Sequence, residues 1–416
     1  MMEYPRLRPS VNAFPIRRQG QQLICLQDPE LIAEKLLFLP EQATFLVSLF
    51  NGQNSVLDVQ AAYTRRFGDL IASDTIQQLI AQLDEHYFLD SQRCAERRQA
   101  LERSFREASE RPAAHAGQSY HADAEKLRYQ LTGFFTGRDG PAAPPQPGDA
   151  WSRRRRLSGI IAPHIDLRFG GPCYAWAYKE LAEAERPDLF IIFGTCHSPL
   201  RTFFALTRKH FQTPLGTLRT DQEFLDTLLS GCGEDLLSEE MVHKLEHTIE
   251  FQTLFLQHLF GGQGPVSILP ILVATFDLLP DGASSPWEVP QIRAFLEHLR
   301  AGIAASGKRV CLVASVDLCH IGQRYGDPRP PTEGELRGMA AADRDLLRHA
   351  EALDAEAFFR SAHPHQERRR ICGLAPIYAF LRTIEASEGR LLRYSFIKQL
   401  EANGGATVSY CSMSFS

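Results

Sequence analysis

The stretch DLFIIFGTCH, residues 188–197, joins an apolar run to a polar cluster and indicates how most of the chain folds. The chain contains three other apolar runs, namely LSGIIA (157–162), VSILPILVA (266–274) and RVCLVAS (309–315). Apolar strands that alternate with amphipathic helices are typical of a sheet with parallel strands. We therefore predict a large α/β domain with a mainly parallel central sheet. The expected helices cover residues 222–229, 248–260, 290–305 and 332–349.

Two apolar segments near the C-terminus, LLRYSFI (391–397) and ATVSYCSMSF (406–415), are expected to pair as antiparallel strands.

The 416 residues suggest two or three domains, because single cores rarely exceed about 300 residues. A composition of 44% hydrophobic and 23% charged residues is that of a folded globular protein rather than a disordered or fibrous one. The net charge of −5 argues against a general polyanion-binding surface.

The nine cysteines are scattered and include no CxxC pair, which excludes a zinc finger and a disulfide framework. The N-terminal segment lacks the apolar core of a signal peptide, and no stretch approaches the roughly 18 apolar residues of a membrane span. We therefore expect a cytoplasmic protein without membrane contact.

Polar clusters follow three of the four central runs directly. His164 follows the first run, His197 the second, and Asp317 and His320 the fourth. In a parallel sheet the carboxyl ends of the strands share one edge, where ligands bind. One such histidine alone would more often be a loop or capping residue, but three at equivalent strand ends favour a common site.

Two further segments are candidates for this site. His247 and Glu250 lie three residues apart at the start of a predicted helix and should share a face. Stabilisation of the helix dipole by Glu250 is an equally good explanation of that pair. Cys372 precedes the last predicted helix and follows three arginines, an environment that should lower the pKa of its thiol. A buried structural cysteine is the alternative.

Seven ordered motifs between Pro112 and Ser416 resemble the Memo family, the B component of the AmmeMemoRadiSam system. They are PHIDLRFGGPCYAWAYKEL, FGTCHSPL, TPLGTLRTDQEF, EHTIEFQTLFL, ILPILV, SVDLCHIGQRYG and ICGLAPI. The family is similar in fold to the class III extradiol dioxygenases (LigB-like proteins), which hold non-haem iron at the strand ends. The resemblance thus implies a dioxygenase-like fold with one metal site.

The same resemblance assigns roles to individual residues. It implies metal ligands at His164, His197 and Cys372, an acid/base role for His320, and a place for Asp317 at the pocket wall. Fe(II) is the expected metal, while a thiolate ligand leaves copper and zinc open.

The chain departs from the family pattern after the first ligand histidine. Many members have Ala-Gly-Tyr there, whereas this chain has Ile165-Asp166-Leu167-Arg168. We expect Asp166 and Arg168 near the pocket mouth, where Asp166 either orients an imidazole or pairs with Arg168. We expect this departure to affect which substrate binds rather than how the metal is held.

The N-terminal part predicts three short helices between Leu37 and Leu89, with Ser55 and Ser73 as N-caps. The order of the sequence motifs in this part resembles that of a PqqD-like winged-helix domain, a module that recognises leader peptides. Few basic residues lie on its third helix, so we expect a peptide ligand rather than nucleic acid. The predicted divisions are a PqqD-like domain (1–95), a charged helical connector (96–111) and a Memo-like α/β metal-binding domain (112–416).

Three functions fit these features, and the sequence does not decide whether the chain is an enzyme. The first is an oxidative or redox step in a radical-SAM-associated pathway, with a radical-SAM enzyme and an AMMECR-type protein as partners. The second is a non-catalytic module that binds a peptide or a metal for a partner enzyme. The third is a zinc-dependent hydrolase.

Overall fold

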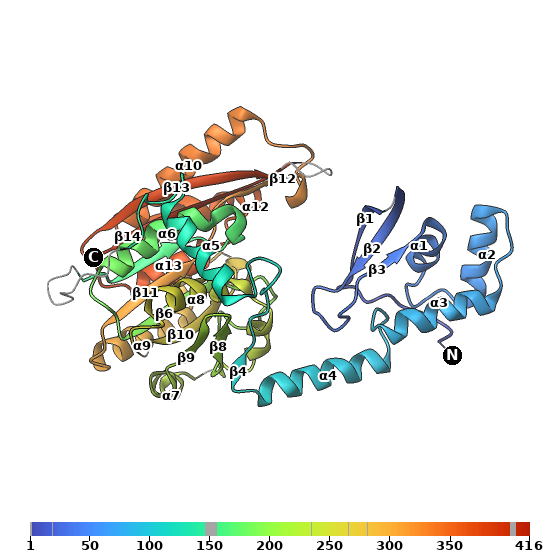
Figure 1. Ribbon diagram of the computed structural model, residues 1–416, viewed down its shortest axis with the longest axis horizontal. Helices are drawn as coiled ribbons and strands as arrows, with labels where there is room; N and C mark the ends of the chain where they lie inside the picture. The colour runs from blue at the N-terminus through green and yellow to red at the C-terminus, as the bar shows by residue number, and fades with distance from the viewer. Residues whose placement is uncertain are drawn as a thin grey trace. The chain divides into compact units, whose positions relative to one another are not determined.

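The computed structural model describes residues 2–18, 20–145, 156–233, 235–264, 266–280, 282–399 and 405–416 (Figure 1). The chain divides into two compact units, Met1–Glu107 and Ala108–Ser416. The charged stretch of the predicted connector forms most of helix α4 (Gln92–Glu107), the last element of the first unit. Strand β4 (Glu110–Arg111) already pairs with a strand of the second unit, so that unit begins a few residues before the predicted position 112.

The first unit contains an antiparallel three-stranded sheet and three helices in addition to α4. The strands are β1 (Asn12–Arg18), β2 (Gln21–Gln27) and β3 (Leu37–Leu39), and the helices are α1 (Glu41–Ser48), α2 (Val56–Phe67) and α3 (Ser73–Glu85). Ser55 caps α2 as predicted, in a capping box with Asp58. The predicted cap at Ser73 is wrong, because Ala72 precedes α3 and Ser73 is its first residue. The PqqD-like assignment stays a prediction.

The centre of the second unit is a run of neighbouring parallel strands. The strands are β5 (Gly159–Ala162), β11 (Val310–Ser315), β6 (Leu189–Thr195), β10 (Ser267–Val273) and β9 (Gly216–Thr220), in that spatial order. Four of them are the predicted apolar runs, which confirms the α/β fold with a mainly parallel sheet. The C-terminal segments form β13 (Gly389–Gln399) and β14 (Ala406–Phe415), antiparallel as predicted.

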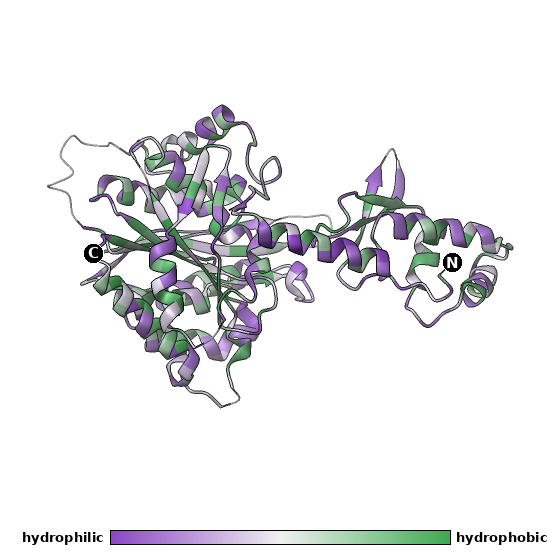
Figure 2. Ribbon diagram, turned by 90° about the horizontal axis from the view of Figure 1, so that it is seen from below, coloured by the Kyte–Doolittle hydropathy of each residue, from purple (hydrophilic) through white to green (hydrophobic). Residues whose placement is uncertain are grey.

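Successive strand residues face opposite sides of the sheet, and each side carries its own apolar core. Ile160 and Ile192 pack with α5 (Ala124–Thr136), α6 (Leu167–Glu183) and α8 (His247–Phe260). Ile161 and Ile191 pack on the other side, with helices that include α7 (Gln222–Gly231), α9 (Pro290–Ala305) and α13 (Leu374–Thr383). Figure 2 shows these strands as hydrophobic ribbons between helices of mixed character. Burial on both faces explains why the runs are continuously apolar rather than alternating.

Several short strands of the second unit were not predicted. They are β7 (Phe204–Leu206), β8 (His210–Thr213) and β12 (His320–Gly322), together with β4 and β9. Strands of two to five residues are too short to show a periodicity that can be recognised in sequence. In the described part of the chain, no helix is long and apolar enough to cross a membrane.

Candidate metal site

Three neighbouring strands end at the same level of the sheet and carry the predicted side chains just beyond their ends. Ser315 of β11 lies opposite both Ala162 of β5 and Gly194 of β6. The residues that follow therefore emerge at one edge of the sheet, as parallel pairing requires. His164 and His197 meet there, with their ring centroids 5.1 Å apart.

His247, the first residue of α8, brings a third imidazole to this edge. Its ring centroid lies 5.3 Å from that of His164 and 5.0 Å from that of His197. One nitrogen from each of the three rings lies within 4.8 Å of the others, which brings all three within reach of one ion. Exposure rises from 2% for the His164 side chain to 30% for His247 and 42% for His197, so the group opens to solvent on the side of His197.

Glu246 holds two of these rings and is the residue that the sequence interpretation missed. Its buried carboxylate accepts from the backbone amides of His197 (2.7 Å) and His247 (2.9 Å) and lies 3.0 and 3.1 Å from their Nδ1 atoms. As the N-cap of α8 it also accepts from the amide of Thr248. A carboxylate at Nδ1 leaves Nε2 as the nitrogen with a free lone pair, the usual arrangement behind a metal-binding histidine.

His164 is oriented in the same manner by a different acceptor. Its Nδ1 lies 3.0 Å from the carbonyl oxygen of Ser315, so its Nε2 is also the free nitrogen. The Oδ1 atom of Asp317 accepts from the amides of His164 (3.1 Å) and Ile165 (3.2 Å), while Oδ2 lies 3.6 Å from His164 Nε2. Asp317 thus fixes the loop after β5 and faces the centre of the cluster.

Cys372 reaches the cluster from the loop before α13. Its Sγ atom lies 3.3 Å from His164 Nε2, and its carbonyl accepts from the hydroxyl of Thr195 at 3.2 Å. Gly373 allows this approach, because a Cβ atom there would lie 2.6 Å from the carbonyl oxygen of Asp317. The structure therefore gathers His164, His197, Asp317 and Cys372 from separate parts of the chain.

Burial and hydrogen bonds together set the protonation of these groups. It lowers the pKa of His164 well below the usual value for histidine, and it lowers the pKa of His247 as well. It raises the pKa of Asp317 to about 7, although the amides of His164 and Ile165 oppose the change. Burial would also lower the pKa of His197, but hydrogen bonds with Cys372 and Glu246 outweigh it and hold that pKa well above the usual value, so His197 must lose a proton when a metal binds.

The expected lowering of the Cys372 pKa was wrong, because burial raises the pKa of this thiol despite a hydrogen bond with His197. The preceding arginines do not offset the burial, since Arg369 pairs with Asp343 and Arg370 with Asp327. A bound divalent metal would deprotonate the thiol directly.

His320 lies at the start of β12, beside the cluster. Its Nδ1 atom lies 2.9 Å from the carbonyl oxygen of Leu318, and its ring meets that of Tyr325 edge to face at 5.1 Å. Burial lowers the pKa of His320 to about 4, and the nearby charge of His197 adds to the effect. The ring is therefore neutral at physiological pH and can accept a proton.

The remaining predicted residues are engaged elsewhere. Asp166 pairs with Arg168 through two contacts of 2.8 Å and caps α6, so it does not orient an imidazole. The side chain of Glu250 is fully buried against Arg111 (2.6 Å) and accepts from the amides of Ala114 and His115. Its carboxylate supports the segment before α5 rather than facing the three imidazoles.

Comparison with known proteins shows the family to which the chain belongs. A family model described as Memo-like protein matches residues 111–414. A MEMO1 family protein of Aquifex aeolicus is 28% identical over 98% of this chain and 100% of its own length. MEMO1 family proteins of Methanopyrus kandleri and Methanosarcina acetivorans are 29% and 28% identical over 74% and 73% of this chain and 99% and 98% of their own lengths. Since the matching model spans well over half of the sequence and includes every side chain of the cluster, the chain belongs to the Memo family.

Proposed function

We propose that this chain binds one iron ion between His164, His197, His247 and Cys372 and acts in an oxidative or redox step. The observation that supports the proposal most strongly is the orientation of the three imidazoles. Each Nδ1 atom lies against an oxygen acceptor, the Ser315 carbonyl for His164 and the Glu246 carboxylate for the other two. The three Nε2 atoms are thus left to bind beside a thiol, a donor set that fits one divalent ion once His197, whose pKa is raised, has lost its proton.

Bound iron would supply one-electron chemistry and the activation of oxygen at this edge of the sheet. The residues around it would control protons and access. His320, neutral at physiological pH, serves as the proton acceptor. Asp317 holds the loop that carries His164, and the exposed side of His197 admits a substrate.

Metal analysis of protein purified without oxygen, followed by an oxygen-uptake assay, tests this proposal. We expect about one iron per chain in the wild type. The Cys372→Ala variant should lose most of its iron, since it lacks the only anionic donor among the four proposed ligands. Cys232→Ala is the matched control, because this thiol lies at the C-terminal end of α7.

Other results would favour the two alternatives. Tight zinc without oxygen consumption would favour a hydrolase, since three imidazoles and a thiolate also suit zinc. Absence of any metal, together with binding of a peptide, would favour a non-catalytic module.

We also propose a cytoplasmic location and membership of a radical-SAM-associated pathway. All nine cysteines are thiols rather than halves of disulfides, as is usual in a reducing compartment. The proposed partners are a radical-SAM enzyme and an AMMECR-type protein, and the first unit would bind a peptide substrate. Co-purification of the tagged chain with both proteins from the same cells tests the assignment, and their absence from the purified complex would count against it.

A further inference from the structure

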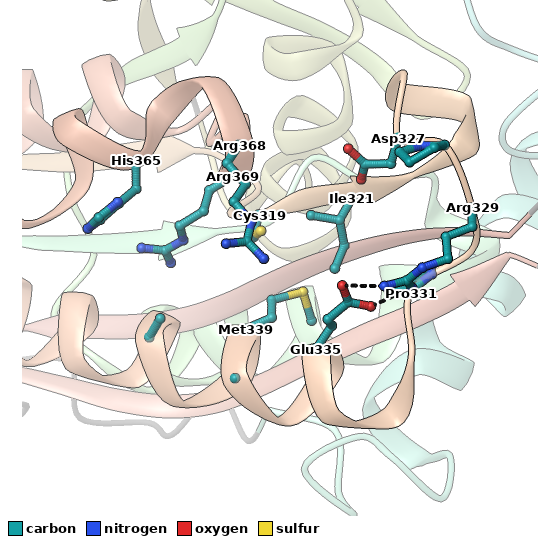
Figure 3. Close-up of a pocket in the computed structure, with 13 residues that line it drawn as sticks. Cys319, Ile321, Asp327, Arg329, Pro331, Glu335, Met339, His365, Arg368 and Arg369 are labelled. Atoms are coloured by element: carbon teal, nitrogen blue, oxygen red, sulfur yellow. Dashed lines mark hydrogen bonds and ion pairs between the residues drawn. The ribbon is translucent and has the colours of Figure 1, made fainter.

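A cavity of about 520 Å³ lies beside β12, apart from the clustered imidazoles (Figure 3). Its walls come from β12, the loop after it, α10 (Glu333–Glu351), and the segment that contains η6 (His363–His365) and α12 (Gln366–Arg369). The volume is within the range of about 300–1,000 Å³ that is typical of small-molecule sites.

Strand β12 separates this cavity from the metal site. Cys319 and Ile321 line the cavity, whereas His320 lies between them in sequence. Adjacent residues of a strand point to opposite faces, so His320 points away from the cavity. The two sites are thus distinct and lie on opposite sides of one short strand.

The cavity combines an apolar floor with a cationic wall. Ile321 and Met339 supply apolar surface, and Pro328 and Pro331 extend it along the loop. Figure 3 shows the ion pair between Arg329 and Glu335, with a closest contact of 2.9 Å, at one side of this surface. A ligand that fits must therefore carry an apolar portion.

The charges of the cavity do not cancel. Arg329 pairs with Glu335, and the two other anionic groups nearby, Asp327 and Asp343, pair with Arg370 and Arg369. In the described part of the chain no ion pair is found for Arg368, which is exposed and lines the cavity. The Nε atom of Arg369 is buried and has no hydrogen-bond partner among the described residues. The guanidinium group of Arg369 is thus only partly satisfied by Asp343.

We propose that this cavity binds a small organic anion, with its carboxylate or phosphate group against Arg368 and Arg369 and its apolar portion on Ile321 and Met339. Guanidinium groups suit both kinds of anion, because their planar donor pairs match two oxygens at once. The ligand would contact residues that lie just before Cys372 in the chain, although its binding does not depend on a metal.

Titration calorimetry of the full chain with octanoate, octyl phosphate and octan-1-ol tests the proposal. At least one of the two anions should bind about tenfold or more tightly than the alcohol, which has the same chain without a charge. The preferred anion then distinguishes a carboxylate ligand from a phosphate ester. The Arg368→Gln variant should weaken anion binding by about tenfold, because it removes one charge-assisted contact.

Gly338→Phe fills the cavity directly. Gly338 lies in α10 and lines the cavity, and a Cβ atom there would meet nothing within 4 Å. Replacement of a glycine inside a helix should keep the melting temperature at or above that of the wild type. This variant should lose anion binding while it retains its metal content.

Substitutions of Arg337 provide the controls for both changes. Arg337 lies on the same helix, is exposed, and does not line the cavity. Arg337→Gln and Arg337→Phe should therefore leave anion binding unchanged. The proposal would be overturned if neither anion bound, if octan-1-ol bound as tightly as the anions, or if Gly338→Phe bound them like the wild type.

Discussion

At the scale of single residues, Glu246 links the end of β6 to the start of α8. One carboxylate orients His197 and His247 and caps the helix that carries His247. Although burial alone would raise its pKa, hydrogen bonds from the two histidines hold the pKa of Glu246 well below the usual value. The carboxylate therefore stays ionised behind the proposed ligands.

Glu246→Gln should weaken metal binding by about 10- to 100-fold, the usual effect of losing a carboxylate that orients ligand histidines. Competition with a chelator of known affinity measures the change. Glu239→Gln is the control, because Glu239 accepts hydrogen bonds from Arg201 and Thr202 rather than from a histidine of the cluster. Equal affinities in the wild type and in Glu246→Gln would show that Glu246 is only a helix cap.

The sequence supports some of these placements and not others. His164, His197 and Asp317 could be placed together because they follow apolar runs that had to be neighbouring parallel strands. Helical spacing put Glu250 on the same face as His247, but it could not reveal that the carboxylate of Glu250 pairs with the buried Arg111. Such a contact depends on segments far apart in sequence.

At the scale of elements, the turn after β2 is held by a buried ion pair in the first unit. Asp28 accepts from Arg8 at 2.8 Å and from the amides of Glu30, Ile32 and Ala33. Burial alone would raise the pKa of Asp28, but the hydrogen bonds from Arg8 and the amides outweigh it and lower the pKa. The pair therefore fixes this turn at neutral pH.

The stability of the first unit should fall in acid for this reason. The contribution of Asp28 is complete above the pKa of the unfolded chain, about 3.9, and is lost as the pH falls through the lower folded value. Asp28→Asn should destabilise the unit by about 3 kcal/mol at neutral pH, since it removes the buried partner of Arg8 and leaves only the more exposed Glu30 to pair with it. Hydrogen exchange of the amides of α1–α3 measures the loss, and the exposed Asp74→Asn serves as control. An unchanged exchange rate in Asp28→Asn would contradict this role.

The long apolar elements were predictable and the short ones were not. The four central strands are buried on both faces, so their sequences are continuous apolar runs with clear ends. Strand β4 has two residues and depends on its partner β8, so no local pattern could assign Arg111 to the second unit. The predicted connector was therefore extended too far into that unit.

At the scale of the whole molecule, the two units differ in how widely relatives share them. The Aquifex aeolicus relative matches 98% of the chain, whereas the two archaeal relatives match 74% and 73% of it with nearly their full lengths. These shorter matches cover about as many residues as the Memo-like region, residues 111–414. The metal site should accordingly form without the first unit.

Two truncations test this division. A chain of residues 108–416 should retain the metal content of the full protein. A chain of residues 112–416 should unfold more easily, by about 3–5 kcal/mol, because it leaves Glu250 buried without Arg111. Arg111 also donates to the carbonyl oxygen of Glu246 at 2.9 Å, so the shorter chain should bind metal more weakly. Chemical denaturation and metal analysis of both chains measure these differences, and equal behaviour would contradict the boundary at residue 108.

The central claim is that one ion binds between the three imidazoles and the thiol at the ends of the parallel strands. Anomalous diffraction at the iron absorption edge, from crystals grown without oxygen in the presence of Fe(II), tests it most directly. The account predicts a single strong peak bounded by His164, His197, His247 and Cys372. Absence of a peak there, or a peak at any other position, would contradict it.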